Sequence, residues 1–154
     1  MSQPASINPR IIDGLYCEAL VLSDEVRAAF SSPALPDNDA DDEDLRRVAL
    51  SCEALRATTR MMHAIAWLLN QRAWMMGEIS EFQLRRHGRL PSDEPRSDPG
   101  RVALLGSEVR ELITATERFY ARLLRLDHAW RQAEPRAPGA ILALRQRITQ
   151  RLHR

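Results

Sequence analysis

The side chains that most often bind metals are few in this sequence and stand at unrelated spacings. A zinc site requires converging cysteine, histidine or carboxylate ligands. The cysteines and histidines are Cys17, Cys52, His63, His87, His128 and His153. Because their spacings match no metal-binding motif, we expect no metal site and two reduced thiols. His63 stands beside an apolar stretch, where a partly buried structural histidine is the commoner outcome.

Nucleophilic and acid–base chemistry also lack a recognisable arrangement. No serine stands in a G-x-S-x-G turn, and residues 80–83 (Ser-Glu-Phe-Gln) match a helix capping box instead. Carboxylate pairs such as Glu78 and Glu81 are three residues apart on predicted helices, where they could share a cleft or face solvent, and we expect solvent. All 22 basic residues are arginine, which excludes lysine Schiff-base chemistry and the lysine of a phosphate-binding loop. We expect no catalytic residue and no cofactor.

Composition indicates a single all-α domain. The chain has 154 residues, of which 44% are hydrophobic and 28% charged, with few aromatic residues and 6 glycines. The net charge of +1 gives no case for nucleic-acid binding. The sequence has neither an 18-residue apolar run nor an N-terminal secretory signal, so we expect a cytoplasmic protein without a membrane span.

Three long segments have the apolar periodicity of helices, and they are predicted at about residues 10–31, 41–76 and 101–131. The first has an apolar face of Ile11, Leu15, Ala19, Leu22, Val26 and Phe30. The third keeps a seven-residue repeat from Val102 to Trp130, which is typical of packing at a shallow angle. We therefore predict an antiparallel bundle of three long helices in which the second and third are antiparallel neighbours.

The central helix is apolar on more than one face. The stripe expected to face the core holds a spacing of three and four residues: Leu45, Val48, Cys52, Leu55, Thr59, Met62, Ala66, Leu69, Ala73 and Met76. Further apolar residues flank its second half, although one helix of a bundle buries about one stripe. Self-association or a partner groove would explain this surplus, with Trp67, Leu68 and Met75 as a possible dimer surface. Alternatively, the first helix and a short helix at 80–87 wrap the extra face.

The connecting segments have clear turn signals. Residues 37–44 are acidic and read as a loop that enters the central helix, whose positive N-terminal end attracts carboxylates. Gly77 is a natural C-cap, and the capping box at residues 80–83 predicts a short helix over 80–87. Residues 88–100 contain three prolines and read as a mobile surface loop with little to bury.

The end of the chain is basic and amphipathic. We assign residues 1–134 to the helical bundle domain and residues 135–154 to a C-terminal tail, in which four arginines accompany an apolar stripe. Such a tail could contact nucleic acid, an acidic membrane surface or an acidic partner, or pack back on the bundle. Its charge is opposite to that of residues 37–44, so head-to-tail association between chains is a further possibility.

One stretch resembles a known family. Residues 60–73 read Arg-Met-Met-His-Ala-Ile-Ala-Trp-Leu-Leu-Asn-Gln-Arg-Ala, and Gly-Glu-Ile-Ser at 77–80 and Gln-Leu-Arg-Arg at 83–86 follow. This pattern resembles RcdA, the regulator of CtrA degradation, a family of small helical bacterial proteins formerly classed as a domain of unknown function. The resemblance is strongest over residues 59–89 and weaker over 117–127. The acidic segment and the proline-rich loop depart from the family pattern.

The resemblance implies a three-helix bundle that can form homodimers and acts as a non-enzymatic adaptor. Its expected partners are the ClpX component of the ClpXP protease, co-adaptors, and a cell-cycle regulator or another cargo. Carried over by motif, the protein-binding surface lies around Gly77, where these residues could instead close the end of the bundle: Gln71, Arg72, Trp74, Glu78, Gln83 and Arg86. The rival hypothesis is a nucleic-acid-associated regulator that grips phosphates with its arginine-rich tail and Arg85, Arg86 and Arg89.

Overall fold

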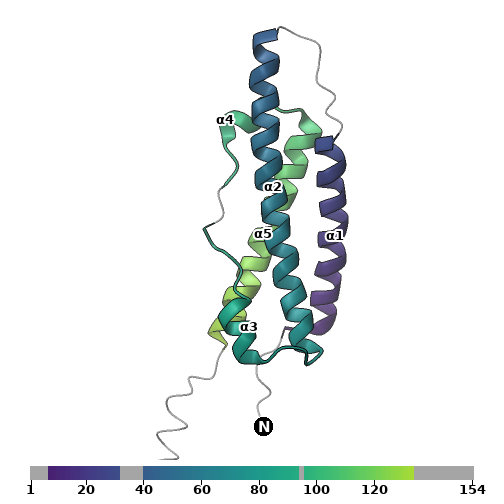
Figure 1. Ribbon diagram of the computed structural model, residues 1–154, viewed down its shortest axis with the longest axis vertical. Helices are drawn as coiled ribbons and strands as arrows, with labels where there is room; N and C mark the ends of the chain where they lie inside the picture. The colour runs from purple at the N-terminus through teal and green to yellow at the C-terminus, as the bar shows by residue number, and fades with distance from the viewer. Residues whose placement is uncertain (1–6, 32–39, 94–95, 134–154) are drawn as a thin grey trace, which may run out of the picture.

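The computed structural model describes residues 7–31, 40–93 and 96–133 of the chain. Within these residues there is no strand. The helices are α1 (Pro9–Ser31), α2 (Ala40–Met75), α3 (Glu81–His87), α4 (Pro99–Val102) and α5 (Ser107–Gln132). The long helices α1, α2 and α5 lie side by side (Figure 1). The predicted all-α bundle with a short extra helix is confirmed, whereas the predicted tail lies outside the described residues.

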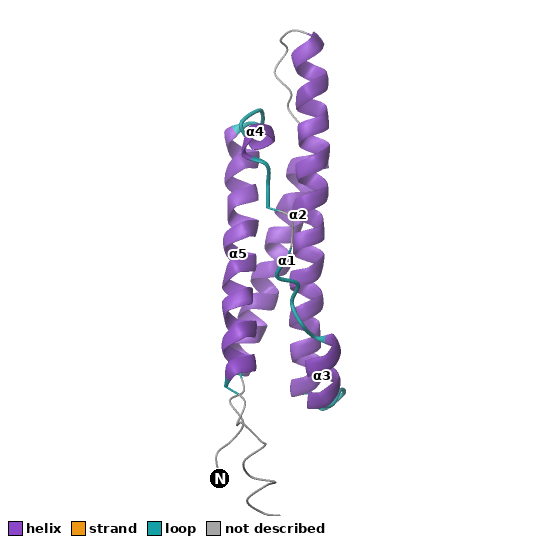
Figure 2. Ribbon diagram, turned by 90° about the vertical axis from the view of Figure 1, so that its left-hand side faces the viewer, coloured by secondary structure: helices purple, strands orange, loops and turns teal. Residues whose placement is uncertain are grey.

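The long helices do not all alternate in direction. α1 runs antiparallel to α2 and α5, but α2 and α5 run parallel to each other (Figures 1 and 2). Side-chain contacts agree, because Arg60 of α2 bonds Thr116 of α5, and Trp67, further along α2, bonds Asp127, further along α5. The prediction that the second and third long helices are antiparallel neighbours is therefore wrong.

The segment after α3 explains this direction, because it is attached to the bundle. Leu90 is only 1% exposed and belongs to the main core cluster. The hydroxyl of Tyr120 donates a hydrogen bond to the carbonyl oxygen of Pro91 at 2.6 Å. The prediction that residues 88–100 have little to bury is therefore wrong at its start.

Further along, two backbone amides hold the same segment against the long helices. The N–H of Ser97 donates to Glu117 of α5 at 3.1 Å, and the N–H of Asp98 donates to Glu53 of α2 at 3.2 Å. The segment thus carries the chain back toward the end at which α2 begins (Figure 2). α5 can start only there, so it must run in the same direction as α2.

The helix ends follow the predicted signals around α3. Gly77 has a positive φ of 76°, which ends α2 in a conformation that glycine adopts readily. The side chain of Ser80 accepts a bond from the N–H of Gln83 at 3.2 Å, and the side chain of Gln83 accepts one from the N–H of Ser80 at 2.8 Å. The predicted capping box is therefore present.

The helix predicted over residues 101–131 is interrupted near its start. Asp98 caps α4 by accepting bonds from two backbone N–H groups, and α5 begins only after Gly106, which has an extended backbone. Leu105, in the interruption, is 8% exposed and packs in a small cluster with Ala49 and Ile113. The interruption of the helix allows this leucine to be buried in the cluster.

The buried face of α1 differs slightly from the prediction. Ile12 is fully buried, whereas Ile11, the residue expected in the core, is 48% exposed. The remaining predicted core positions of α1 are buried or half-buried: Leu15, Ala19, Leu22, Val26 and Phe30. Each helical residue advances about 100° around the axis, so a shift of one residue selects a different face.

The buried face of α2 is not the predicted stripe. The core-facing residues of α2 are Ala49, Glu53, Ala57, Arg60, Met61, Ala64, Trp67, Leu68 and Gln71. In contrast, Leu55 and Met62 of the predicted core stripe are 69% and 64% exposed. The prediction is therefore wrong about which face enters the core. Ala57 and Ala64 on the buried face allow neighbouring helices to approach closely, because the distance between helix axes depends on the side chains at the contact.

Candidate protein-binding surface

The end of the bundle around Gly77 is built on an aromatic and arginine cluster. Trp130 near the end of α5 is buried, and the ring of Trp74 meets it edge-on with ring centroids 6.0 Å apart. The guanidinium of Arg85 from α3 lies 4.7 Å from the Trp130 ring centroid, and that of Arg131 lies 5.7 Å from it. The contact of Arg85 with Trp130 fastens α3 to the end of α5.

A chain of polar contacts continues from this cluster into the core. The indole N–H of Trp67 donates to Asp127 at 2.9 Å, and the guanidinium of Arg131 donates to the same carboxylate at 3.1 Å. Arg131 also donates to the backbone carbonyl of Arg85 at 3.3 Å. The buried carboxylate thereby has both a neutral and a charged donor, as a buried charge requires.

Three of the predicted protein-binding residues take part in the packing of the bundle. Gln71 is fully buried, and its side-chain amide atoms have no hydrogen-bond partner among the described residues. Arg72 contacts Asp13 at 3.2 Å and stacks over the ring of Tyr16 at 4.7 Å, so it joins α2 to α1. Trp74 packs on Trp130, as described above. The alternative role of closing the bundle fits these three residues.

The predicted dimer surface is largely internal. Trp67 is 2% exposed and Leu68 is fully buried, so the prediction that these two residues face a second copy is wrong. Met75 is half-buried and packs against the main core cluster. Their apolar character is explained by α1 and α5, which cover this face of α2.

The other predicted protein-binding residues lie at the surface. Glu78, Gln83 and Arg86 are all exposed, although the side chain of Gln83 is engaged by the capping box. Beside them lie two apolar residues that the sequence pattern did not indicate as surface residues, Met76 and Phe82, each 70% exposed. We name Glu78, Phe82 and Arg86 the bundle-end patch.

A periodicity argument would have found Phe82. Leu84 is fully buried and anchors α3 to the bundle. A helical residue two positions earlier lies about 200° around the axis, so Phe82 must face away from the core. The short helix therefore presents an aromatic side chain to solvent.

A second polar network, also missed, lies nearer the start of α2 and α5. Arg60 is 3% exposed and donates to Thr116 at 2.7 Å, with Glu117 at 3.6 Å. Glu53 is fully buried and accepts a bond from Arg56 at 2.7 Å in addition to the amide of Asp98. Because these groups bond to one another and to the backbone, we assign the network to holding the connecting segment in place.

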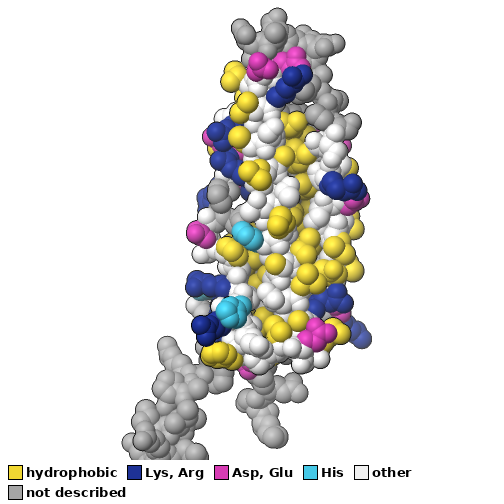
Figure 3. All heavy atoms as spheres, in the orientation of Figure 1, with side chains coloured by type: hydrophobic (Ala, Val, Ile, Leu, Met, Phe, Trp, Pro, Cys, Tyr) yellow, Lys and Arg dark blue, Asp and Glu magenta, His cyan; other side chains and the backbone are white. Residues whose placement is uncertain are grey.

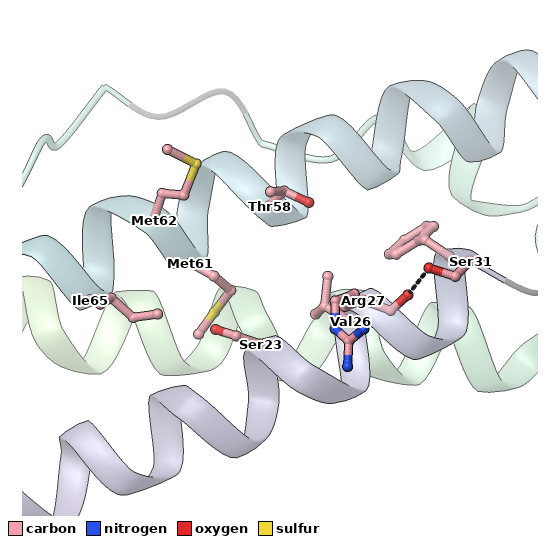
Figure 4. A pocket seen from close by; sticks show the side chains of 9 residues that line it. Ser23, Val26, Arg27, Ser31, Thr58, Met61, Met62 and Ile65 are labelled. Carbon is pink, nitrogen blue, oxygen red and sulfur yellow. Dashed lines mark hydrogen bonds between the residues drawn. The ribbon is translucent and has the colours of Figure 1, made fainter.

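A cavity of about 400 Å³ lies between α1 and α2 (Figure 4). Its lining is mainly apolar: Ser23, Val26, Arg27, Phe30, Ser31, Thr58, Met61, Met62 and Ile65. The hydroxyl of Ser31 bonds the carbonyl oxygen of Arg27, and Asp24 raises the pKa of Arg27 through a hydrogen bond and charge attraction. Met61 points toward α1, whereas Met62 points away from it at the rim. The cavity suits an apolar side chain.

The stripe predicted for the core forms a continuous outer face of α2. We name its ten residues the outer stripe; nine lie in α2 and Met76 directly follows its end: Leu45, Val48, Cys52, Leu55, Thr59, Met62, Ala66, Leu69, Ala73 and Met76. The six larger apolar side chains are between 45% and 70% exposed. Hydrophobic side chains gather along α2 on this face of the molecule (Figure 3). Large contiguous patches of exposed apolar surface mark sites of interaction with other proteins, membranes or ligands.

These features define the class of protein: an all-α bundle of three long helices with exposed apolar surface on α2 and at the bundle end. The chain belongs to a family described as protein of unknown function, DUF1465, whose model matches residues 3–152. No curated protein and no solved structure matches it. None of the described helices has the length and apolar character to cross a membrane. The described residues contain no group of three or more acidic, histidine or cysteine side chains placed to hold a metal ion.

Proposed function

We propose that this protein is a non-enzymatic adaptor that binds other proteins through the bundle-end patch. The observation that carries this proposal is the 70% exposure of Phe82, beside the exposed charges of Glu78 and Arg86. An exposed aromatic side chain next to arginine is the composition typical of binding hot spots. Buried Leu84 and the contact of Arg85 with Trp130 anchor α3, which carries Phe82 and Arg86, to the bundle, so little backbone freedom is lost on binding.

The finer form of the proposal rests on the resemblance to RcdA. The segment that carries this resemblance, residues 59–89, is the one that builds the bundle-end patch. We propose that the protein helps to deliver a cell-cycle regulator or another cargo to the ClpXP protease in the cytoplasm, together with co-adaptors, and that it acts as a homodimer. The rival role in nucleic-acid binding has less support, because Arg85 is already engaged by Glu81 and Trp130.

The proposal is tested by reconstituted proteolysis with purified ClpXP, the candidate cargo and the co-adaptors. We expect Phe82→Ala to weaken cargo or co-adaptor binding roughly tenfold, as truncation of a hot-spot aromatic does, and to slow degradation of the cargo correspondingly. Leu104→Ala is the matched control, because Leu104 is also an exposed apolar residue but lies outside the patch.

Two results would overturn the proposal. The first is a pull-down with the full chain that retrieves neither the protease nor a co-adaptor. The second is a Phe82→Ala variant that delivers cargo at the rate of the unchanged protein.

A further inference from the structure

We propose that the outer stripe of α2 pairs with the outer stripe of a second copy, with the two α2 helices antiparallel. This inference specifies the self-association included in the proposed function and makes no use of the adaptor activity. Its first support is regularity: the ten residues follow two interleaved seven-residue repeats over the whole helix. Such a repeat is the pattern of a helix that packs lengthwise on another helix, yet α1 and α5 contact a different face of α2.

The length of the stripe restricts the partner. From Leu45 to Met76 the helix rises about 46 Å at 1.5 Å per residue. An occupant must supply an apolar helix face of similar length and the same periodicity. The α2 helix of a second copy meets both requirements, because its stripe has the same length and the same spacing.

Side-chain size along the stripe indicates the relative direction. One repeat carries the larger side chains Val48, Leu55, Met62, Leu69 and Met76. The other repeat, after Leu45, carries the smaller side chains Cys52, Thr59, Ala66 and Ala73. In a parallel pair each residue would face its own copy, so large would meet large and small would meet small. In an antiparallel pair the two repeats face each other, so large side chains fit against small ones, as close packing requires.

The antiparallel arrangement has a register that uses the whole stripe. When Thr59 faces Met62 of the second copy, Leu55 faces Ala66, Cys52 faces Leu69 and Val48 faces Ala73. Leu45 then faces Met76, so all ten positions of each helix have a partner. A shift by one heptad in either direction would leave residues at the ends without one.

The cavity between α1 and α2 lies at the centre of this register. The two-fold axis would pass level with residues 60 and 61, and the cavity lining includes Thr58, Met61 and Met62 at the same level. The apolar cavity can therefore receive a side chain of the second copy, in the way that a knob enters a hole.

Charge also favours the antiparallel direction. The first turns of α2 carry Asp42, Glu43 and Asp44, of which Asp42 and Asp44 are exposed. A parallel pair would place these acidic turns of the two copies side by side. Ion pairs of Asp42 and Glu43 with Arg46 and Arg47 offset part of their charge, and the like charges that remain repel each other at short distance. An antiparallel pair separates them by the length of the helix and opposes the two helix dipoles, which is favourable.

The surface is tested with the purified full chain by light scattering, in the absence of protease or cargo. We expect a dimer that becomes a monomer of half the mass in Leu55→Asp, while helicity by circular dichroism is retained because Leu55 is 69% exposed. Val21→Asp is the matched control, since Val21 is 60% exposed on α1 and outside the stripe. A monomeric unchanged chain, or a Leu55→Asp variant that stays dimeric, would overturn the inference.

The direction is tested by disulfide cross-linking after Cys17 and Cys52 have been replaced by serine. In the antiparallel register Leu55→Cys combined with Ala66→Cys should cross-link the two copies, whereas neither single variant should do so. The two copies of residue 55 would lie eleven residues apart along the helix, about 16 Å, which a disulfide cannot span. Cross-linking by Leu55→Cys alone would show a parallel pair and overturn the proposed direction.

Failure of this inference and failure of the adaptor proposal are distinguishable. The light-scattering and cross-linking measurements contain only this chain, whereas the proteolysis assay depends on the bundle-end patch and on Phe82, which is not part of the outer stripe. A monomer that still delivers cargo would overturn the pairing and leave the adaptor role standing.

Discussion

Trp67 fills the core and satisfies a buried charge with the same side chain. Its ring is 2% exposed in the main cluster, and its N–H donates to Asp127, which also pairs with Arg131. Residue 67 was recognisable in the sequence as apolar, but its bond to a carboxylate sixty residues away was not. Gln71 and Arg60, two further buried polar residues of α2, were equally invisible, because polarity normally predicts exposure.

We expect Trp67→Phe to lower the free energy of unfolding by about 2 kcal/mol, because an aromatic ring is kept but Asp127 loses a buried donor. Urea denaturation followed by circular dichroism measures this loss. Trp74→Phe is the control, since Trp74 is only half-buried and its contact with Trp130 is between rings. If both variants lost the same stability, the hydrogen bond to Asp127 would contribute nothing of its own.

At the scale of the elements, local signals set where most helices begin and end. Among the described helices, only the start of α5 is shifted by contacts with distant parts of the chain. The capping box at Ser80 and the positive φ of Gly77 could be read from the sequence, since they depend on a few neighbouring residues. The interruption before α5 could not, because it serves the burial of Leu105 against Ala49 and Ile113 from distant positions.

The same substitution should have opposite effects at two glycines. Gly77→Ala forces a side chain into the left-handed region and should lower the free energy of unfolding by about 1 kcal/mol. Gly14→Ala should raise it by about 0.5–1 kcal/mol, because residue 14 is helical and an added Cβ meets no atom within 4 Å. Thermal or urea unfolding of both variants provides the comparison, and a stabilising Gly77→Ala would contradict the assigned role of this residue.

At the scale of the whole molecule, the connecting segment from Gly88 to Asp98 decides the topology. Its described residues, 88–93 and 96–98, lie along α2 and α5, with Leu90 in the main core and the N–H groups of Ser97 and Asp98 bonded to glutamate side chains of the two long helices. The result is a bundle in which α2 has α1 and α5 on one side and its outer stripe on the other. The candidate protein-binding surfaces therefore depend on the path by which the segment after α3 leads the chain back to the start of α5.

We expect Leu90→Ala to lower the free energy of unfolding by about 2–5 kcal/mol, as truncation of a buried leucine does. Leu104→Ala should cost less than about 1 kcal/mol, because Leu104 is already 39% exposed and leaves no large cavity. Denaturant unfolding of the two variants measures the difference. Equal costs would show that the segment after α3 is not part of the core.

The sequence by itself determined that the protein is helical, where the long helices lie and how α3 is capped, because these features depend on residues within one or two helical turns. It also located the segment that builds the bundle end, residues 59–89. The sequence revealed the ten-residue stripe of α2 but not whether this stripe faces the core or the solvent. It indicated Glu78 and Arg86 as surface residues, but it did not indicate Phe82 and Met76.

Only the tertiary structure decided which face of α2 enters the core and in which direction α5 runs. Periodicity measures how apolar residues repeat around one helix. Besides the exposed outer stripe, α2 has a face made largely of alanine, aromatic and polar residues, and this face is the buried one. The apolar repeat of the outer stripe did not indicate it. The choice between the two faces is made by α1, α5 and the attached segment at Leu90. Their packing joins residues far apart in the chain, which no local pattern records.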